Sequence, residues 1–157
     1  MKKLSLVYRA SQASKRGFTL IEILVVIGII AVLAAIVIVA INPARQFAQA
    51  RNTQRTSNVE TILNAVGQNL ADNKGIFTCA GASITSTANN IGTTGGLEDL
   101  SCLVPTYVTA IPFDPTNGTA ADTKYDIKVD SAGRYTVCAP GGAEAAIPGS
   151  SAICLTR

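Results

Sequence analysis

The clearest pattern in the chain is an apolar run without a polar side chain at residues 23–41, ILVVIGIIAVLAAIVIVAI. At a rise of about 1.5 Å per residue, a run of this length forms a helix of roughly 28 Å, which is about the thickness of the hydrocarbon core of a bilayer. The run therefore predicts a helix that spans a membrane.

Helical periodicity returns farther along the chain. Apolar residues at spacings i, i+3, i+4, i+7 and i+11 form one stripe, and they are Val59, Ile62, Leu63, Val66 and Leu70. An amphipathic helix of this kind packs its stripe against another element. Gly75 suits the left-handed position past a helix end, so residues 73–75 predict the stop. A continuous helix over residues 18–73 would be about 84 Å long, and a small domain could bury only its second half.

Strand patterns lie near the C-terminal end. Residues 79–96, CAGASITSTANNIGTTGG, lack apolar periodicity and predict a surface loop, with a short helix or turn near residues 97–103. Tyr125, Ile127 and Val129 alternate with polar residues, and alternation resumes at Tyr135 and Val137 after a turn at residues 130–133. This pattern predicts a β-hairpin.

Composition narrows the classes of function. The chain has 157 residues, of which 48% are hydrophobic, and its mean hydropathy of +0.32 is too high for a disordered polypeptide. It contains no histidine, the usual group for acid–base catalysis and a common zinc ligand. It also lacks a P-loop, a G-x-S-x-G motif and a dinucleotide fingerprint. We therefore expect neither an enzyme nor a cofactor.

Four cysteines follow the apolar run, and none forms a C-x-x-C pair: Cys79, Cys102, Cys138 and Cys154. This spacing favours two disulfides, and hence an oxidising compartment, over a redox or zinc motif. Cys138 and Cys154 both take the strand parity opposite to their apolar neighbours, which favours their pairing among the three possible connectivities. Cys79 and Cys102 would then tie the ends of the loop.

The net charge of +3 comes from the N-terminal segment. Five basic residues precede Gly17, which leaves eight basic residues against ten acidic ones in the rest of the chain. By the positive-inside rule, the N-terminal segment stays in the cytoplasm, although three arginines on the far side of the run weaken the bias. These are Arg45, Arg51 and Arg55.

Glu22 lies at the beginning of the apolar run, where an unpaired charge is costly and indicates a function. An ordinary secretory signal peptide does not fit, because the run is long enough to span a membrane. A plain membrane anchor has no need of this acid. A small residue, Gly17, beside a basic pair also leaves the backbone open to a protease.

Residues 15–22, KRGFTLIE, resemble the type III signal of type IV prepilins and of type II secretion pseudopilins. The resemblance implies that a prepilin peptidase cuts between Gly17 and Phe18 on the cytoplasmic face and that Phe18 is then N-methylated. It also implies that Glu22 meets the Phe18 amine of a neighbouring subunit during filament assembly. The alternative is that Glu22 caps its own helix or pairs with its own amine.

The fold implied by the resemblance is α+β: a long N-terminal helix whose second half packs on a small antiparallel sheet. The expected division is a cleaved leader at residues 1–17, a transmembrane helix and filament core at 18–41, an amphipathic continuation at 42–74 and an extracytoplasmic domain at 75–157. The implied function is a pilin that polymerises into a type IV pilus. The alternatives are a pseudopilin of a secretion or DNA-uptake piston and, from another class, a membrane-anchored binding module.

The implied partners are other pilin subunits, the prepilin peptidase, an assembly platform with its ATPase, and the membrane, without a direct nucleic-acid site. The subunit would lie in the inner membrane before assembly, with a cytoplasmic N-terminus, and in a pilus or periplasmic pseudopilus afterwards.

The polar stretch at residues 44–58 has two interpretations. Pro43, just past the apolar run, removes one helical hydrogen bond and predicts a kink or a locally melted turn. Beyond it, Arg51 and Arg55 lie one helical turn apart. They belong either to a solvated or headgroup-level face, or to contacts with acids of neighbouring subunits.

Four acids in or beside predicted loops are candidate calcium ligands: Asp114, Asp122, Asp126 and Asp130. Their spacing does not match an EF-hand, and acids in turns are usually solvated, so we expect no metal site.

Overall fold

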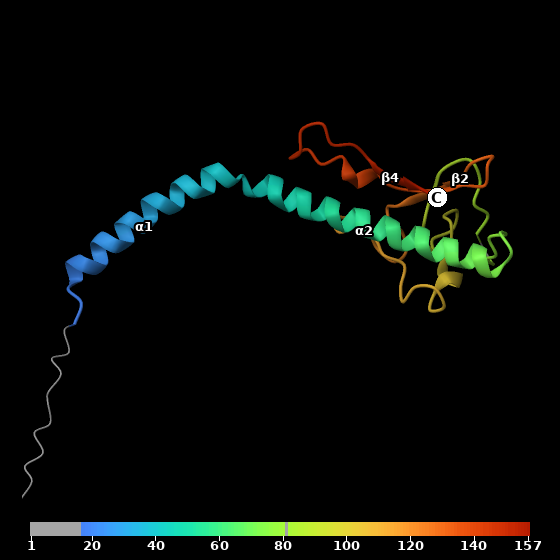
Figure 1. Cartoon of the computed structure of the whole chain (residues 1–157), viewed down its shortest axis with the longest axis horizontal. Coiled ribbons are helices and arrows are strands. Elements are labelled where there is room, and N and C mark those ends of the chain that lie inside the picture. Colours follow the sequence, from blue (N-terminus) through green and yellow to red (C-terminus); the bar gives the residue numbers. More distant parts are fainter. Residues whose placement is uncertain (1–16, 81) are drawn as a thin grey trace, which may run out of the picture. The chain divides into compact units, whose positions relative to one another are not determined.

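The computed structural model describes residues 17–80 and 82–157 (Figure 1). These residues form two compact units, of which the first ends at Ile41 and the second is Asn42–Arg157. The first unit contains one helix, α1 (Leu20–Ile41), in which no residue is buried. The second unit contains helix α2 (Pro43–Asp72) and a sheet.

The two helices are separated at Asn42, which adopts a left-handed backbone with φ 45°. The Asn42 side chain accepts a hydrogen bond from the backbone N–H of Arg45 at 3.3 Å. Of the two predicted outcomes at Pro43, a kink or a locally melted turn, the structure has the interruption, and Pro43 opens a second helix. The physical reason is that proline has no N–H to lose in a first helical turn and its fixed φ suits that position.

Helix α2 buries the predicted stripe and ends at the predicted stop. Val59, Ile62, Leu63 and Val66 are buried, and Leu70 packs against them. The chain leaves the helix through Lys74 and Gly75, both with positive φ, and the Gly75 N–H donates to the Leu70 carbonyl at 2.7 Å.

The sheet has four antiparallel strands in the order β1 (Asn89–Asn90), β2 (Asp126–Val129), β3 (Tyr135–Ala139) and β4 (Ile153–Thr156). The predicted hairpin is confirmed: β2 pairs with β3, with Val129 opposite Tyr135. Strands β3 and β4 contact α2, and Figure 1 shows the sheet beside the second half of that helix. The α+β fold class is thus confirmed.

Part of the segment predicted as a surface loop belongs to the sheet and to the core. Asn89 and Asn90 form the edge strand β1, and Ile91 is only 1% exposed in the core. The prediction failed because a two-residue strand has no alternation to detect, and the edge of β2 is what makes these residues extended. The short 3-10 helices Ser101–Leu103 and Pro140–Gly142 complete the unit.

Candidate processing and assembly site

The candidate site begins in the non-helical residues just before α1. Gly17, Phe18 and Thr19 are non-helical and exposed, and Phe18 is 84% exposed. Among the described residues other than its chain neighbours, none has an atom within 4 Å of the position that a Cβ on Gly17 would occupy. The peptide bond between Gly17 and Phe18 is therefore held in neither a helix nor a packed core, as a protease substrate requires.

Thr19 and Glu22 close the start of α1 with a reciprocal set of hydrogen bonds. The backbone N–H and the hydroxyl of Thr19 donate to Glu22 Oε2 at 2.8 and 2.9 Å. The Glu22 N–H donates to the Thr19 hydroxyl at 3.3 Å. This is a capping box, in which each side chain binds a backbone donor of the other residue that the helix leaves unpaired. The alternative in which Glu22 caps its own helix thus has a structural basis in the single chain.

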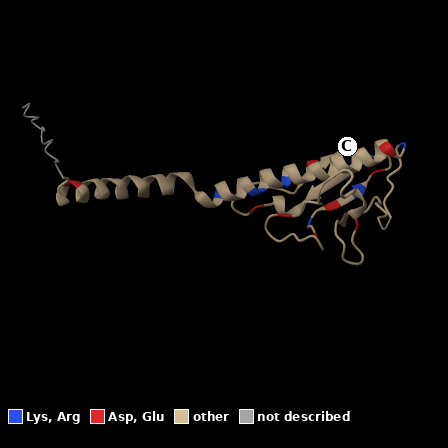
Figure 2. Ribbon diagram, turned by 90° about the horizontal axis from the view of Figure 1, so that it is seen from below, with Lys and Arg blue, Asp and Glu red and all other residues tan. Residues whose placement is uncertain are grey.

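Helix α1 is otherwise apolar. Glu22 is the acid of its first turn. Figure 2 shows an acidic position at the start of this helix. Among the described residues, α1 is the one helix long and apolar enough to cross a membrane. The arrangement is an exposed non-helical segment, an acid in the first helical turn and then an apolar surface long enough to span a membrane.

A protein-family comparison matches residues 12–38 to the prokaryotic N-terminal methylation motif. The chain carries the signal sequence of type IV pilins and pseudopilins. Searches of curated proteins and of solved structures found no match. The motif supports a pilin-like or pseudopilin subunit, a structural class of protein, and together with α1 it fits a membrane-anchored chain.

The chain carries both expected disulfides, Cys79–Cys102 and Cys138–Cys154. Cys138 and Cys154 lie directly opposite each other on β3 and β4, as their parity predicted. The first bond joins the start of the long loop to the 3-10 helix at Ser101–Leu103.

A buried ion cluster lies between α2 and two loops that are distant in the sequence. Arg55 is 2% exposed, and its Nε donates to Asp114 Oδ2 at 2.6 Å. Its remaining N–H groups donate to Asp114 Oδ1, the Thr116 hydroxyl, Asn52 Oδ1 and Glu144 Oε1. All five guanidinium donors are thus used. Both sequence interpretations of Arg55, a solvated face and an intersubunit contact, were wrong.

Arg51 joins the same cluster through the loop between β3 and β4. Its Nε and Nη2 donate to the two oxygens of Glu144, each at 2.7 Å. Hydrogen bonds from Arg51 and then Arg55 lower the pKa of Glu144 from 4.5 to about 2. Arg51, like Arg55, therefore pairs with an acid of its own chain.

Asp114 shows two opposing influences. Burial raises the pKa of its carboxyl group, but the hydrogen bond from Arg55 and the backbone N–H groups of Thr116 and Asn117 outweigh that effect and lower it. Asp114 therefore stays ionised opposite Arg55 and is a structural acid.

The other acids considered as calcium ligands are dispersed. Asp122 pairs with Lys124 at 2.5 Å, and Asp130 pairs with Arg134 at 2.8 Å. Burial raises the pKa of Asp126. Across residues 17–80 and 82–157, no three acidic, cysteine or histidine side chains form a group that could hold a metal ion.

Sequence reasoning missed Thr19, Asp114 and Glu144 as partners in these sites. The Thr19-x-x-Glu22 pattern was a usable signal, because a threonine three residues before a glutamate is the sequence form of a capping box. No local signal existed for Asp114 and Glu144, which lie 59 and 89 residues from Arg55.

Proposed function

We propose that the chain is a type IV pilin. In this proposal, α1 holds the subunit in the inner membrane, a prepilin peptidase cleaves between Gly17 and Phe18, and Phe18 is N-methylated. The observation that carries the proposal is the accessible Gly17–Phe18 bond, followed at once by a single acid in the first turn of a 22-residue apolar helix. The mature subunit then polymerises, with Glu22 bound to the Phe18 amine of a neighbour.

The capping box is compatible with this assembly role. Thr19 binds Glu22 Oε2, and no hydrogen bond to Oε1 is found in the described part of the chain. A carboxylate has about four lone-pair sites, so one group can cap its own helix and accept an amine. At about 4 Å and an effective dielectric of about 20, such a charge pair attracts by about 4 kcal/mol before desolvation. The pair would fix the axial position of each added subunit.

The proposal assigns a role to each part of the chain. Residues 1–17 are the leader, 18–41 the span and filament core, 42–74 the helix beneath the globular domain, and 75–157 the outer domain. The partners are other pilin subunits, the peptidase, and an assembly platform with its ATPase. After assembly, the subunit lies in an extracellular pilus.

A pseudopilin of a periplasmic piston is the second candidate, because the same N-terminal motif serves both classes. The two disulfides and the loop-rich outer domain favour the pilin. A retraction ATPase encoded next to this gene would support the pilus, and secretion genes in its place would support the piston.

Two matched variants test the proposal. Glu22→Gln keeps a side chain that can complete a capping box but removes its charge, whereas Thr19→Ala removes the cap and keeps the charge. We expect Glu22→Gln to abolish filaments, because the buried amine of the neighbour loses its counter-charge at a cost of about 3 to 5 kcal/mol per subunit. Thr19→Ala should retain filaments, since losing a helix cap costs about 1 kcal/mol.

Sheared filaments would be counted by electron microscopy, and the intact mass of each membrane-bound subunit would be measured. Wild type and both variants should begin at N-methylated Phe18, which shows that processing is intact. A chain beginning at Met1 contradicts the proposal. Filaments retained in Glu22→Gln but lost in Thr19→Ala would mean that Glu22 acts through its cap alone.

A further inference from the structure

Phe47 is an exposed aromatic residue on an otherwise polar part of α2. Its side chain is 67% exposed, whereas the next residue, Ala48, is 0% exposed. The globular unit thus covers one face of α2 from Ala48 onward and leaves Phe47 uncovered. A large apolar side chain gains free energy when it leaves water, so an additional surface would stabilise Phe47.

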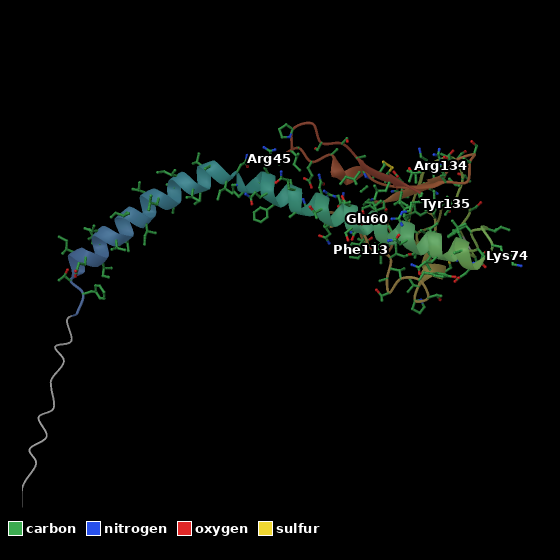
Figure 3. The ribbon with its side chains drawn as sticks, in the orientation of Figure 1. Arg45, Glu60, Lys74, Phe113, Arg134 and Tyr135 are labelled. Carbon is green, nitrogen blue, oxygen red and sulfur yellow. A yellow bond between two sulfur atoms is a disulfide. The ribbon has the colours of Figure 1, made fainter. Side chains whose placement is uncertain are left out.

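Arg45 is the first cation after the apolar helix, because the last turn of α1 has no basic residue. It is exposed, and no salt bridge involving Arg45 is found within residues 17–80 and 82–157. The next two arginines, Arg51 and Arg55, are neutralised by Glu144 and Asp114. Among Arg45, Arg51 and Arg55, Arg45 is therefore the residue whose positive charge is available to an external anion. Figure 3 labels it near the start of α2.

Chain length places both side chains close to the end of the apolar span. Helix α1 has 22 residues, about 33 Å, which fills the hydrocarbon core of a bilayer. Arg45 and Phe47 follow Ile41 by only four and six residues. The chain therefore keeps both side chains close to the boundary between the hydrocarbon core and the headgroup layer, which is about 5 to 8 Å thick on each side. Helical side chains lean toward the N-terminus of their own helix, so the Phe47 ring leans toward the first turn of α2.

We propose that residues 43–49 form an interfacial segment of the membrane-inserted subunit, with Arg45 bound to anionic phospholipid headgroups and the Phe47 ring inserted at the acyl-chain boundary. This inference rests on the proposed membrane anchorage by α1. Continuity with the apolar span, the unpaired cation and the uncovered aromatic ring favour a lipid surface as the occupant. Amphipathic side chains at such a boundary set the depth of the subunit before assembly.

The chain has no tryptophan, so a single introduced tryptophan reports one position. The full-length Phe47→Trp variant would be reconstituted in vesicles of phosphatidylcholine, with or without phosphatidylglycerol, that carry bromine on the upper acyl chain. Leu33→Trp, in the middle of α1, controls for insertion. Phe113→Trp, which replaces a 47% exposed aromatic in the globular unit, controls for an aqueous position (Figure 3).

We expect blue-shifted emission and bromine quenching for Phe47→Trp and Leu33→Trp, and neither for Phe113→Trp. Adding Arg45→Gln to Phe47→Trp should remove the increase in quenching that phosphatidylglycerol produces over phosphatidylcholine. Aqueous, unquenched emission from Phe47→Trp with a quenched Leu33→Trp overturns this inference and leaves the anchorage intact.

Two further outcomes are decisive. An unquenched Leu33→Trp overturns the anchorage itself, and this inference with it. Blue-shifted emission from Phe47→Trp that bromine does not quench and that dilution reverses means that a second copy of the chain, not lipid, covers the ring.

Discussion

Arg55 illustrates how one residue holds distant segments together. Its guanidinium binds Asp114, Thr116 and Glu144 from loops and Asn52 from its own helix. Gly141 packs closely against the same cluster, because a Cβ added at this position would lie 2.7 Å from Asp114 Oδ2 and 3.1 Å from Arg55 Nε. Such a cluster is stable only when it is complete, since each missing member leaves a buried polar group unpaired.

We predict that Arg55→Met and Arg55→Lys each lower the free energy of unfolding of the globular unit by about 3 to 5 kcal/mol. Lysine does not rescue the site, because a compact ammonium group cannot reach the fork of partners that the planar guanidinium binds. The measurement is urea unfolding of the full chain in detergent micelles, followed by tyrosine circular dichroism. Arg45→Met, at an exposed position, is the control and should change stability by less than about 0.5 kcal/mol. A fully stable Arg55→Lys variant would contradict the prediction.

Helix α2 and the loop between β3 and β4 are joined mainly by polar contacts. Glu144 of the loop receives both Arg51 and Arg55, and the Asn52 side chain donates to the Gly142 carbonyl at 2.9 Å. The low pKa of Glu144 means that folding favours its ionised form. Its contribution to stability is therefore complete above its ordinary pKa and is lost as the pH falls toward the folded value.

Acid titration tests this contact between elements. As the pH falls from 4.5 toward 2, the range set by Glu144, the globular unit should lose stability as this carboxylate takes up a proton. Glu144→Gln should be less stable at neutral pH and should show a smaller decrease over the same range. The free energy of unfolding would be measured at several pH values for both chains. Identical pH profiles would show that Glu144 does not stabilise the loop.

The elements that the sequence predicted are those with a local pattern. Apolar continuity indicated α1, a periodic stripe indicated α2, and strict alternation indicated the β2–β3 hairpin. Strand β1 was not predictable, because Asn89 and Asn90 have low strand propensity and become extended only against the β2 edge. The roles of Arg51 and Arg55 depend on partners 59 to 93 residues away, and no local spacing encodes such contacts.

At the scale of the whole molecule, the buried core belongs to one unit. The core residues run from Val59 to Ala139, and α1 contributes none of them. Asn42 closes the start of α2 with its own side chain, so that helix does not need α1 to begin. The globular unit therefore has the core and the helix cap that independent folding requires.

We predict that a chain of residues 42–157, exported to an oxidising compartment, folds without α1. It should be soluble, contain both disulfides and melt within about 5 °C of the same unit in the full chain, as measured by circular dichroism and non-reducing peptide mapping. A chain of residues 59–157, which lacks Arg51 and Arg55, is the matched control and should remain unfolded. Failure of the longer fragment to fold would show that α1 contributes to the unit.

The order of the disulfides along the chain has a consequence for biosynthesis. Cys79 bonds to the next cysteine, Cys102, and Cys138 bonds to the last, Cys154, so the two covalent loops neither cross nor nest. An oxidant that joins cysteines in the order in which they leave the ribosome makes both native bonds directly. The maturing subunit then requires an oxidase and no disulfide isomerase.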